Sequence, residues 1–246
     1  MQTLLERAVR RLAGSAEARA LLTRGGLIVA AKVAGNLLTL LYTVMLARVT
    51  APQDLGLALT ALSSAFLISV LASLNVESGS IRYLVAYRHA GEAEKAAGFV
   101  RFGWRVVLVA APAILVLFLL AGAVRPDGTA GWAFAIALCA APVMAVTRIC
   151  SRHATALDAV LQGTLPRLLV RPLLFTLVLG AVLLAGRTVS AAFVMVLFFL
   201  ASALVALTQV LLLARPLRPV LAARPDLSEW REWLTTGVML APMLVM

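Results

Sequence analysis

The sequence predicts an all-α, polytopic membrane helix bundle, and its composition and its apolar segments indicate this class. Of the 246 residues, 62% are hydrophobic and only 13% are charged. Soluble domains contain about 45–50% apolar and about 25% charged residues, so the excess is too large for a soluble core. The apolar segments are continuous and do not alternate with polar residues, which favours helices over the strands of a membrane barrel.

Six segments are long enough to cross a bilayer, because a spanning helix needs about 20 apolar residues. They are residues 25–47, 55–76, 106–124, 132–149, 168–184 and 191–214. A seventh apolar segment, 234–246, begins and stops before it could span. We therefore expect an amphipathic cytoplasmic segment over 1–24, a six-helix transmembrane lobe over 25–214, and a cytoplasmic loop with the start of a truncated seventh helix over 215–246.

Basic residues alternate between the loops and thereby predict the topology. Of the 22 lysine and arginine residues, 18 lie before the first span, between the second and third, around the connection from the fourth to the fifth, or after the sixth. The other three loops hold one arginine each. Because loops rich in lysine and arginine stay cytoplasmic, the amino terminus is predicted to be cytoplasmic. This pattern also explains the net charge of +11 without a nucleic-acid partner.

Two further segments are predicted to lie on the cytoplasmic surface. In residues 1–24, Leu4, Leu5, Ala8 and Leu12 share one helical face opposite charged residues, which indicates a short interfacial helix. Residues 83–103 are expected on the same surface before the third span. At the end of the second span, Glu77 and Arg82 are expected to pair.

A polar stripe runs along the first span. Lys32, Asn36, Thr39 and Thr43 are spaced four, three and four residues apart, so they share one helical face. Lys32 lies about 10 Å into a core of about 30 Å. A charge there costs about 2.5–3.5 kcal/mol on insertion scales, and such residues usually face a cavity. The stripe predicts a substrate-binding cavity surface. In the alternative interpretation, Lys32 snorkels to the interface and the other side chains join helices.

Arginines border the fourth and fifth spans. Arg167 and Arg171, flanked by Pro166 and Pro172, would share a face at the mouth of the fifth span if the chain is helical there. Two guanidinium forks at a bent helix mouth could hold a pyrophosphate. Arg148 and Arg152, next to His153, allow the same interpretation. In the alternative, all four arginines only anchor the helices on the cytoplasmic side.

The sequence contains no signature of catalysis. It has no Walker loop, no GxGxxG, no paired acids, no zinc-ligand spacing and no evident Ser/His/Asp arrangement. Every acidic residue falls in a loop or at the end of a span, so we expect no buried carboxylate for proton coupling within the six helices. We accordingly predict no catalytic residue, no metal and no cofactor, and a protein that is not an enzyme.

Three stretches resemble a known family. They are LARVTAPQDLGLALTALSSAF (46–66), LNVESGSIRYL (74–84) and ALDAVLQGTLPRLLVRPLLF (156–175). Their order and spacing, together with six spans, resemble the polysaccharide-biosynthesis flippases, the Wzx-type branch of the multidrug/oligosaccharidyl-lipid/polysaccharide exporter superfamily. The matching positions are Leu46, Ala47, Arg48, Pro52, Gly56, Arg82, Leu161, Pro166, Arg171 and Pro172.

The resemblance covers roughly residues 20–230 and implies a transporter of two six-helix lobes, of which this chain resembles the amino-terminal one. It implies a multi-pass protein of the bacterial cytoplasmic membrane that flips a polyprenyl-pyrophosphate oligosaccharide for surface polysaccharide, such as the O-antigen of lipopolysaccharide. The implied partners are membrane lipid, the lipid-linked oligosaccharide and the polysaccharide polymerase machinery. Since the seventh helix stops early, the chain is also expected to be a fragment.

Other functions stay open. A lipid II flippase is a close alternative within the same superfamily. A cation-coupled multidrug exporter usually needs a membrane carboxylate, which the sequence does not indicate. A membrane glycosyltransferase or O-antigen polymerase would need catalytic residues in sizeable outer loops, and those loops are short here. An inactive half-transporter or a structural scaffold is the remaining alternative.

Overall fold

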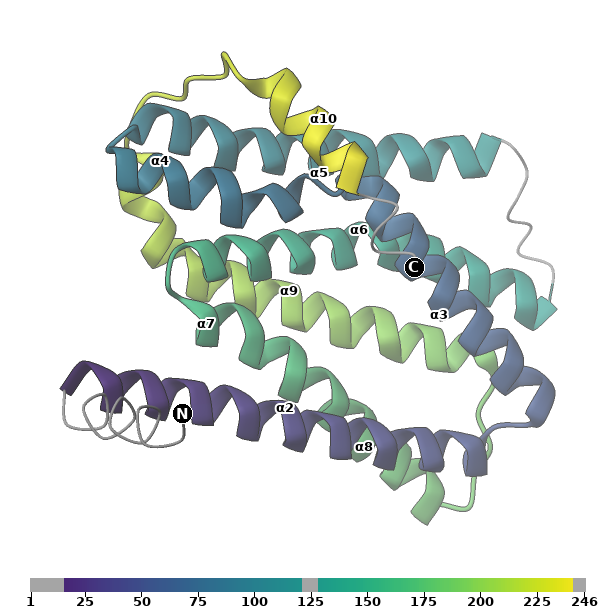
Figure 1. Ribbon diagram of the computed structural model, residues 1–246. Coiled ribbons are helices and arrows are strands. Elements are labelled where there is room, and N and C mark those ends of the chain that lie inside the picture. The colour runs from purple at the N-terminus through teal and green to yellow at the C-terminus, as the bar shows by residue number, and fades with distance from the viewer. Residues whose placement is uncertain (1–15, 121–127, 241–246) are drawn as a thin grey trace, which may run out of the picture.

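The computed structural model describes residues 16–120 and 128–240, and this part of the chain is almost entirely helical (Figure 1). Six helical segments are long and apolar enough to cross a membrane. The described residues form no β-sheet, and their one isolated β-bridge joins Thr50 to Val189. These observations confirm the prediction of a multi-pass all-α membrane protein.

The six segments consist of α2, α3, α5, α6, the α7–η3–α8 run and α9. Their bounds are Ala16–Val49 for α2, Pro52–Ser73 for α3, Ala93–Leu120 for α5, Gly128–Ala156 for α6, Val160–Leu165 for α7, Pro166–Val170 for the π-helical turn η3, Arg171–Leu184 for α8 and Ala191–Leu221 for α9. Shorter elements are η1 (Val76–Gly79), η2 (Ser80–Leu84), α4 (Val85–Ala90) and α10 (Trp230–Leu240).

Helix α6 lies at the centre of the bundle and packs mainly against α9 and α3. The contact with α3 is built from small side chains, since these let two helices approach closely. They are Ala58, Ala61 and Ala65 of α3, with Ala133, Ala137 and Ala140 of α6. All six are buried in one apolar cluster, which forms the core of the membrane part.

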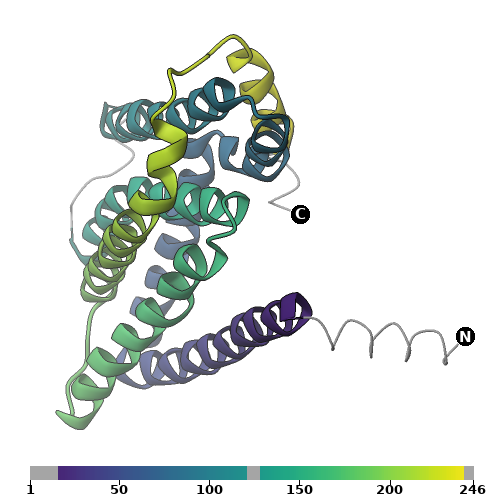
Figure 2. The ribbon, with the colours of Figure 1, turned by 90° about the vertical axis from the view of Figure 1, so that its left-hand side faces the viewer.

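Helix α2 stands apart from this centre and packs chiefly on α8 (Figure 2). Beside this contact, Gly35 of α2 approaches η3, where an added Cβ would collide with the carbonyl oxygen of Leu168. From residue 25 onward, most of the remaining surface of α2 is exposed, including large apolar residues such as Leu37 and Leu40.

A second core lies at the end of the bundle where α5 and α7 begin and α6 and α9 end, which we call the arginine-rich end. Here α10 packs against η1 and α5. Trp233 of α10 is fully buried and contacts the rings of Phe99, Phe102 and Tyr87. Its indole donates a hydrogen bond to the Tyr87 hydroxyl at 2.9 Å. Aromatic packing thus joins α10 to the bundle.

Several helices extend beyond the predicted spans, and the longest extensions lie at the arginine-rich end. Helix α5 begins at residue 93 rather than 106, α6 continues to 156, the fifth segment begins at 160, and α9 continues to 221. Residues 83–103 are therefore divided between η2, α4 and the first turns of α5. The spans predicted from hydropathy end near the first charged residues. The helices continue past them because apolar side chains of these extensions pack in the second core.

The structure describes only part of the two end segments, residues 1–24 and 215–246. Residues 16–24 continue the first helix without a break, so they are not a separate surface helix. The face of Leu4, Leu5, Ala8 and Leu12 lies outside the described residues. The seventh helix begins at Trp230, four residues before the predicted start, and residues 241–246 are also outside the described part.

Candidate functional site

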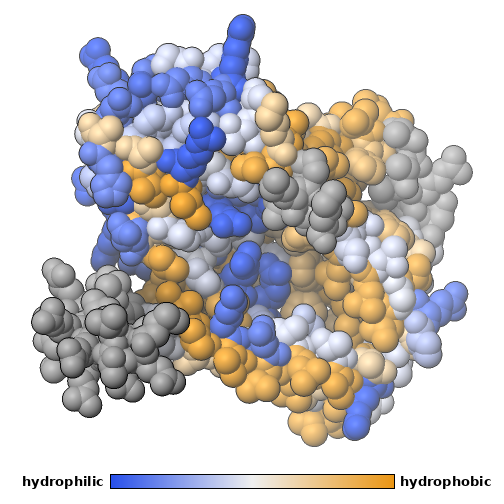
Figure 3. Space-filling model, viewed as in Figure 1, coloured by the Kyte–Doolittle hydropathy of each residue, from blue (hydrophilic) through white to orange (hydrophobic). Residues whose placement is uncertain are grey.

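A polar pocket of about 340 Å³ lies near the arginine-rich end of the bundle, between α6, the end of α3 and the α7–η3 run. In Figure 3, hydrophilic side chains gather in a hollow of the surface above α2, between otherwise hydrophobic helices. The residues that line the pocket are Phe66, Glu77, Arg148, Ser151, Arg152, Thr155, Thr164 and Arg167. Three of the eight are arginines and one is a carboxylate, so the lining carries a net positive charge.

The local sequence of α6 explains one wall. Arg148, Ser151, Arg152 and Thr155 recur every three or four residues, so they project from one helical face. This pattern was visible in the sequence, but only its arginines were chosen as candidates. Because α6 continues to residue 156, Arg148 and Arg152 lie about two turns and one turn before its end. Both arginines are therefore inside the helix rather than in a loop beyond it.

The opposite wall of the pocket is formed by the α7–η3 run, and α7 packs tightly against α6. The chain reverses between α6 and α7 at Asp158, which has a positive φ of 60°. Gly163 of α7 then packs directly on Ala154 and Ser151, where any larger side chain would collide. The Ser151 hydroxyl donates to the Gly163 carbonyl at 3.0 Å. The Gln209 amide of α9 donates to the Ser151 hydroxyl and to the Gly163 carbonyl, and thereby links α9 to both helices of this contact.

Glu77 and Arg148 form a buried ion pair at the edge of the pocket. The Glu77 side chain is only 1% exposed and that of Arg148 is 14% exposed. Arg148 Nη2 lies 2.6 Å from Glu77 Oε1. This finding corrects one prediction, since Glu77 pairs with Arg148 and not with Arg82. Glu77 lies in η1, just beyond the end of α3 and outside the six spanning segments. Arg82 is instead exposed over the ring of Tyr83.

Arg152 and Arg167 carry the available positive charge of the pocket. Within residues 16–120 and 128–240, neither guanidinium makes an ion pair or a side-chain hydrogen bond. A guanidinium group offers five N–H donors in a planar fork that matches phosphate and carboxylate oxygens. The two arginines approach the pocket from α6 and η3, so the arrangement can bind an anion between two helices.

Arg171 does not line this pocket, although we expected it to share a face with Arg167. Its guanidinium lies 5.1 Å from the centre of the Phe198 ring of α9. Its Nε atom is buried and has no hydrogen-bond partner among the described residues. Arg171 begins α8 and packs against α9, whereas Arg167, one turn earlier in η3, lines the pocket.

The polar stripe of α2 forms a separate surface. Lys32, Asn36 and Thr43 are exposed and Thr39 is half-buried. Thr39 donates to the Gly35 carbonyl at 2.8 Å and Thr43 to the Thr39 carbonyl at 2.7 Å. Both hydroxyls therefore bond within their own helix and do not join α2 to a neighbour. None of the four stripe residues lines the polar pocket.

His153 has a structural environment. Its ring is fully buried, lies edge-on to Phe99 and places Nδ1 3.0 Å from the hydroxyl of Ser80. It thus belongs to the second core and not to the pocket lining. Among the described residues, no three His, Cys, Asp or Glu side chains lie close enough to hold a metal ion.

Comparison of the chain with protein-family models, with curated proteins and with solved structures gave no match. The likeness to oligosaccharide flippases therefore rests on the sequence stretches alone. The fold and the pocket define a multi-pass membrane protein with a cationic site inside its helix bundle.

Proposed function

We propose that this bundle is one lobe of a membrane transporter that moves a polyprenyl-pyrophosphate oligosaccharide across the bacterial cytoplasmic membrane. The observation that carries the proposal is a pair of arginines, Arg152 and Arg167, in a polar pocket of a membrane helix bundle, where neither has a side-chain partner among the described residues. The resemblance of three sequence stretches to oligosaccharide flippases supports the same function.

The physical problem is a large polar headgroup that cannot enter hydrocarbon. Arg152 and Arg167 would hold the pyrophosphate through charge-assisted hydrogen bonds, which are about twice as strong as neutral ones. The hydroxyls of Ser151, Thr155 and Thr164 line the same pocket and would contact the first sugar. The polyprenyl tail would stay in the lipid, and rocking of this lobe against a second lobe, which a second copy of the chain would supply in the purified protein, would complete the transfer.

In this proposal the arginine-rich end faces the cytoplasm, as the distribution of basic residues predicts. The pocket near that end would load the lipid-linked oligosaccharide where it is synthesised. The polar stripe at Lys32, on a different surface of α2, would offer a further polar contact during translocation. No covalent step is required, and the polysaccharide polymerase machinery would receive the product.

A cation-coupled exporter of the same superfamily is the second candidate, and Glu77 favours it. Such exporters usually need a membrane carboxylate, and Glu77, just beyond the end of α3, is a buried carboxylate beside the pocket. Its ion pair with Arg148 weakens this candidate, because a carboxylate that is already neutralised by an arginine binds a cation less well.

The test is a flipping assay in proteoliposomes with a fluorescent polyprenyl-pyrophosphate disaccharide and a membrane-impermeant quencher. We expect the purified chain to accelerate flipping above protein-free vesicles, and Arg152→Ala with Arg167→Ala to reduce the rate at least about tenfold, since each hydrogen bond to a charged group contributes about 1.5–3 kcal/mol. The matched control is Arg187→Ala, an exposed arginine at the opposite end of the bundle.

Equal rates for the double variant and the Arg187→Ala control would contradict the role of the pocket. A wild-type rate no higher than that of empty vesicles would contradict flipping by this chain. Accumulation of a cationic dye driven by an ion gradient, without flipping, would favour the exporter instead.

A further inference from the structure

We propose that an anionic phospholipid binds between α5 and the last turns of α9, with an acyl chain in the apolar pocket there and its phosphate at Arg218. This inference is independent of the proposed transport function. It rests on a pocket of about 670 Å³, which lies in the range of about 300–1,000 Å³ typical of ligand sites.

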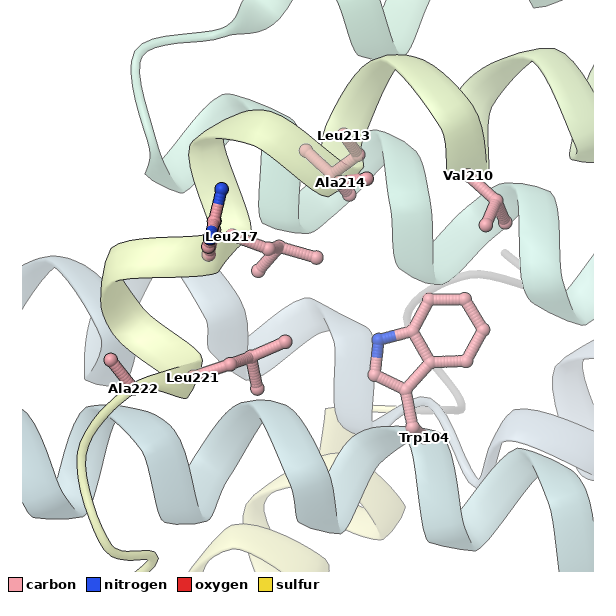
Figure 4. A pocket seen from close by; sticks show the side chains of 8 residues that line it. Trp104, Val210, Leu213, Ala214, Leu217, Leu221 and Ala222 are labelled. Carbon is pink, nitrogen blue, oxygen red and sulfur yellow. The ribbon is translucent and has the colours of Figure 1, made fainter.

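The lining is apolar on both walls. Trp104 points from α5 towards α9, and the side chains of Val210, Leu213, Leu217 and Leu221 face it from α9 (Figure 4). Ala214 and Ala222 complete the lining, and Arg218 is its one charged residue. No acidic residue lines the pocket, so nothing in its lining neutralises Arg218.

The pocket exists because α9 bends while α5 continues. Pro216 and Pro219 lie inside α9, where each removes a backbone N–H donor and collides with the preceding turn. The end of α9 therefore turns across α5 (Figure 4). Arg101 of α5 donates to the Leu221 carbonyl at 2.8 Å and holds this end in place. Between the bend and this hydrogen bond, the two helices are separated by an apolar space.

The position along the helices identifies the ligand as an amphiphile. The walls made by Val210 and Leu213 belong to the apolar part of α9, whereas Arg215 and Arg218 follow one turn later. A lipid has the same order of apolar chain and then phosphate. Basic pockets between membrane helices bind anionic headgroups. The arginine-rich end provides the positive electrostatic potential that attracts such a headgroup.

The occupant is therefore expected to carry a net negative charge. A zwitterionic phospholipid would place its own cation near Arg218, which weakens the attraction. We thus expect phosphatidylglycerol to bind more tightly than phosphatidylcholine, and we expect the difference to shrink as salt screens the charges.

Trp104 reports occupancy directly. The full-length protein is reconstituted in vesicles of brominated phosphatidylglycerol or brominated phosphatidylcholine, because bromine on an acyl chain quenches a tryptophan that it touches. The chain has four tryptophans. The contribution of Trp104 is obtained as the difference between the wild type and Trp104→Phe, measured in each lipid.

We expect the Trp104 emission to be quenched at least twofold more by brominated phosphatidylglycerol than by brominated phosphatidylcholine. Arg218→Ala should abolish this preference, and Arg215→Ala, an exposed neighbour that does not line the pocket, should retain it. Ala214→Phe, which fills the pocket from α9, should lower quenching by both lipids. Because both arginines are exposed, neither replacement is expected to impair folding, and circular dichroism checks this.

Equal quenching by the two lipids would overturn the proposal and make Trp104 an ordinary lipid-facing side chain. Absence of quenching by either lipid would also overturn it, since a protein segment would then cover the pocket. Equal loss of preference in Arg215→Ala and Arg218→Ala would show a general surface charge effect and overturn the assignment of Arg218.

Discussion

Arg148 donates a hydrogen bond from Nε to Oε1 of Glu77 at 2.7 Å, and its Nη2 atom lies 2.6 Å from the same oxygen in an ion pair. The other oxygen, Oε2, is buried and has no partner among the described residues. The two residues are far apart in the chain, on α6 and on η1. Their contact joins the end of α3 to α6 and neutralises Arg148, so that Arg152 and Arg167 remain the cations available to a ligand.

Replacement of Glu77 by Gln should therefore destabilise the bundle strongly. It removes the only charge that compensates Arg148 within the described residues, and breaking one side of a buried ion pair costs about 3–5 kcal/mol. Unfolding of the purified protein in mixed detergent micelles, followed by circular dichroism, measures this change. The matched control is Glu92→Gln, because Glu92 is 43% exposed in its ion pair with Lys95 and such pairs contribute about 0–1 kcal/mol.

The double variant Glu77→Gln with Arg148→Met should recover a large part of the loss. A buried pair that is removed as a whole leaves no uncompensated charge, and apolar replacements are often neutral. If the double variant were as unstable as the sum of both single variants, the two residues would not be coupled, and the stability role of the pair would be wrong.

The contact between α2 and η3 leads to a second stability prediction. Gly35→Ala would place a Cβ on the carbonyl oxygen of Leu168, so α2 must move away, and overpacking of this kind costs about 1–3 kcal/mol. Gly26→Ala in the same helix meets open space and should stabilise by roughly 0.5–1 kcal/mol through helix propensity. The thermal midpoints of the two variants should therefore shift in opposite directions. Identical shifts would contradict the close approach at Gly35.

The docking of α10 should weaken in acid because of Glu229. Hydrogen bonds from Lys95 and from the Tyr87 hydroxyl lower the pKa of Glu229 below its ordinary value of 4.5, and Asp226 nearby acts in the opposite sense. A lowered pKa in the folded state means that the stabilisation is complete above about pH 4.5 and is lost as the pH falls through the folded value. The effect should stay below about 1 kcal/mol, since the pair with Lys95 is partly exposed.

This dependence can be measured as the rate of trypsin cleavage after Arg224 and Arg231 in samples held briefly at pH 7 or pH 4 and cross-linked before digestion. We expect faster cleavage of the sample from pH 4. Glu229→Gln should cleave equally fast after both treatments. A pH effect that persists in this variant would assign the acid sensitivity to another group.

The sequence predicted the position of a side chain where rotation within one helix decides it. It did not predict positions that depend on contacts between helices. The spacing of Lys32, Asn36, Thr39 and Thr43 places them on one face of α2, because helical rotation alone decides this. The spacing of Arg167 and Arg171 could not show that Arg171 packs over Phe198 while Arg167 lines the pocket, because this depends on where α9 lies. The ion pair of Glu77 could not be predicted, because its partner Arg148 is brought near only by the packing of α6.

The bounds of the helices also depend partly on local composition and partly on contacts between helices. Apolar runs located all six spans, because transfer to hydrocarbon depends on local composition. They did not show that α5 begins at residue 93 or that α9 continues past Arg215 and Arg218. The extension of α5 is stabilised where its Phe99 and Phe102 contact Trp233 of α10, which lies in a different part of the chain.

Substitution of Lys32 tests transport without a change in stability. Its side chain is exposed on α2, and within the described residues it makes no ion pair or hydrogen bond, so Lys32→Ala removes no internal contact. The change should even favour insertion, because a charge within the membrane costs about 2.5–3.5 kcal/mol. If the stripe contacts the headgroup during translocation, flipping should fall several-fold while insertion and thermal stability stay normal.

Two further variants refine this result in the same proteoliposome assay. Lys32→Gln keeps a polar side chain without the charge, so a rate like that of Lys32→Ala would show that the positive charge is what matters. Leu37→Ala is the control on a different face of α2, where the side chain is 62% exposed, and it should flip at the wild-type rate. Unchanged flipping in Lys32→Ala would remove the stripe from the transport path and leave Arg152 and Arg167 as the sole candidates for headgroup binding.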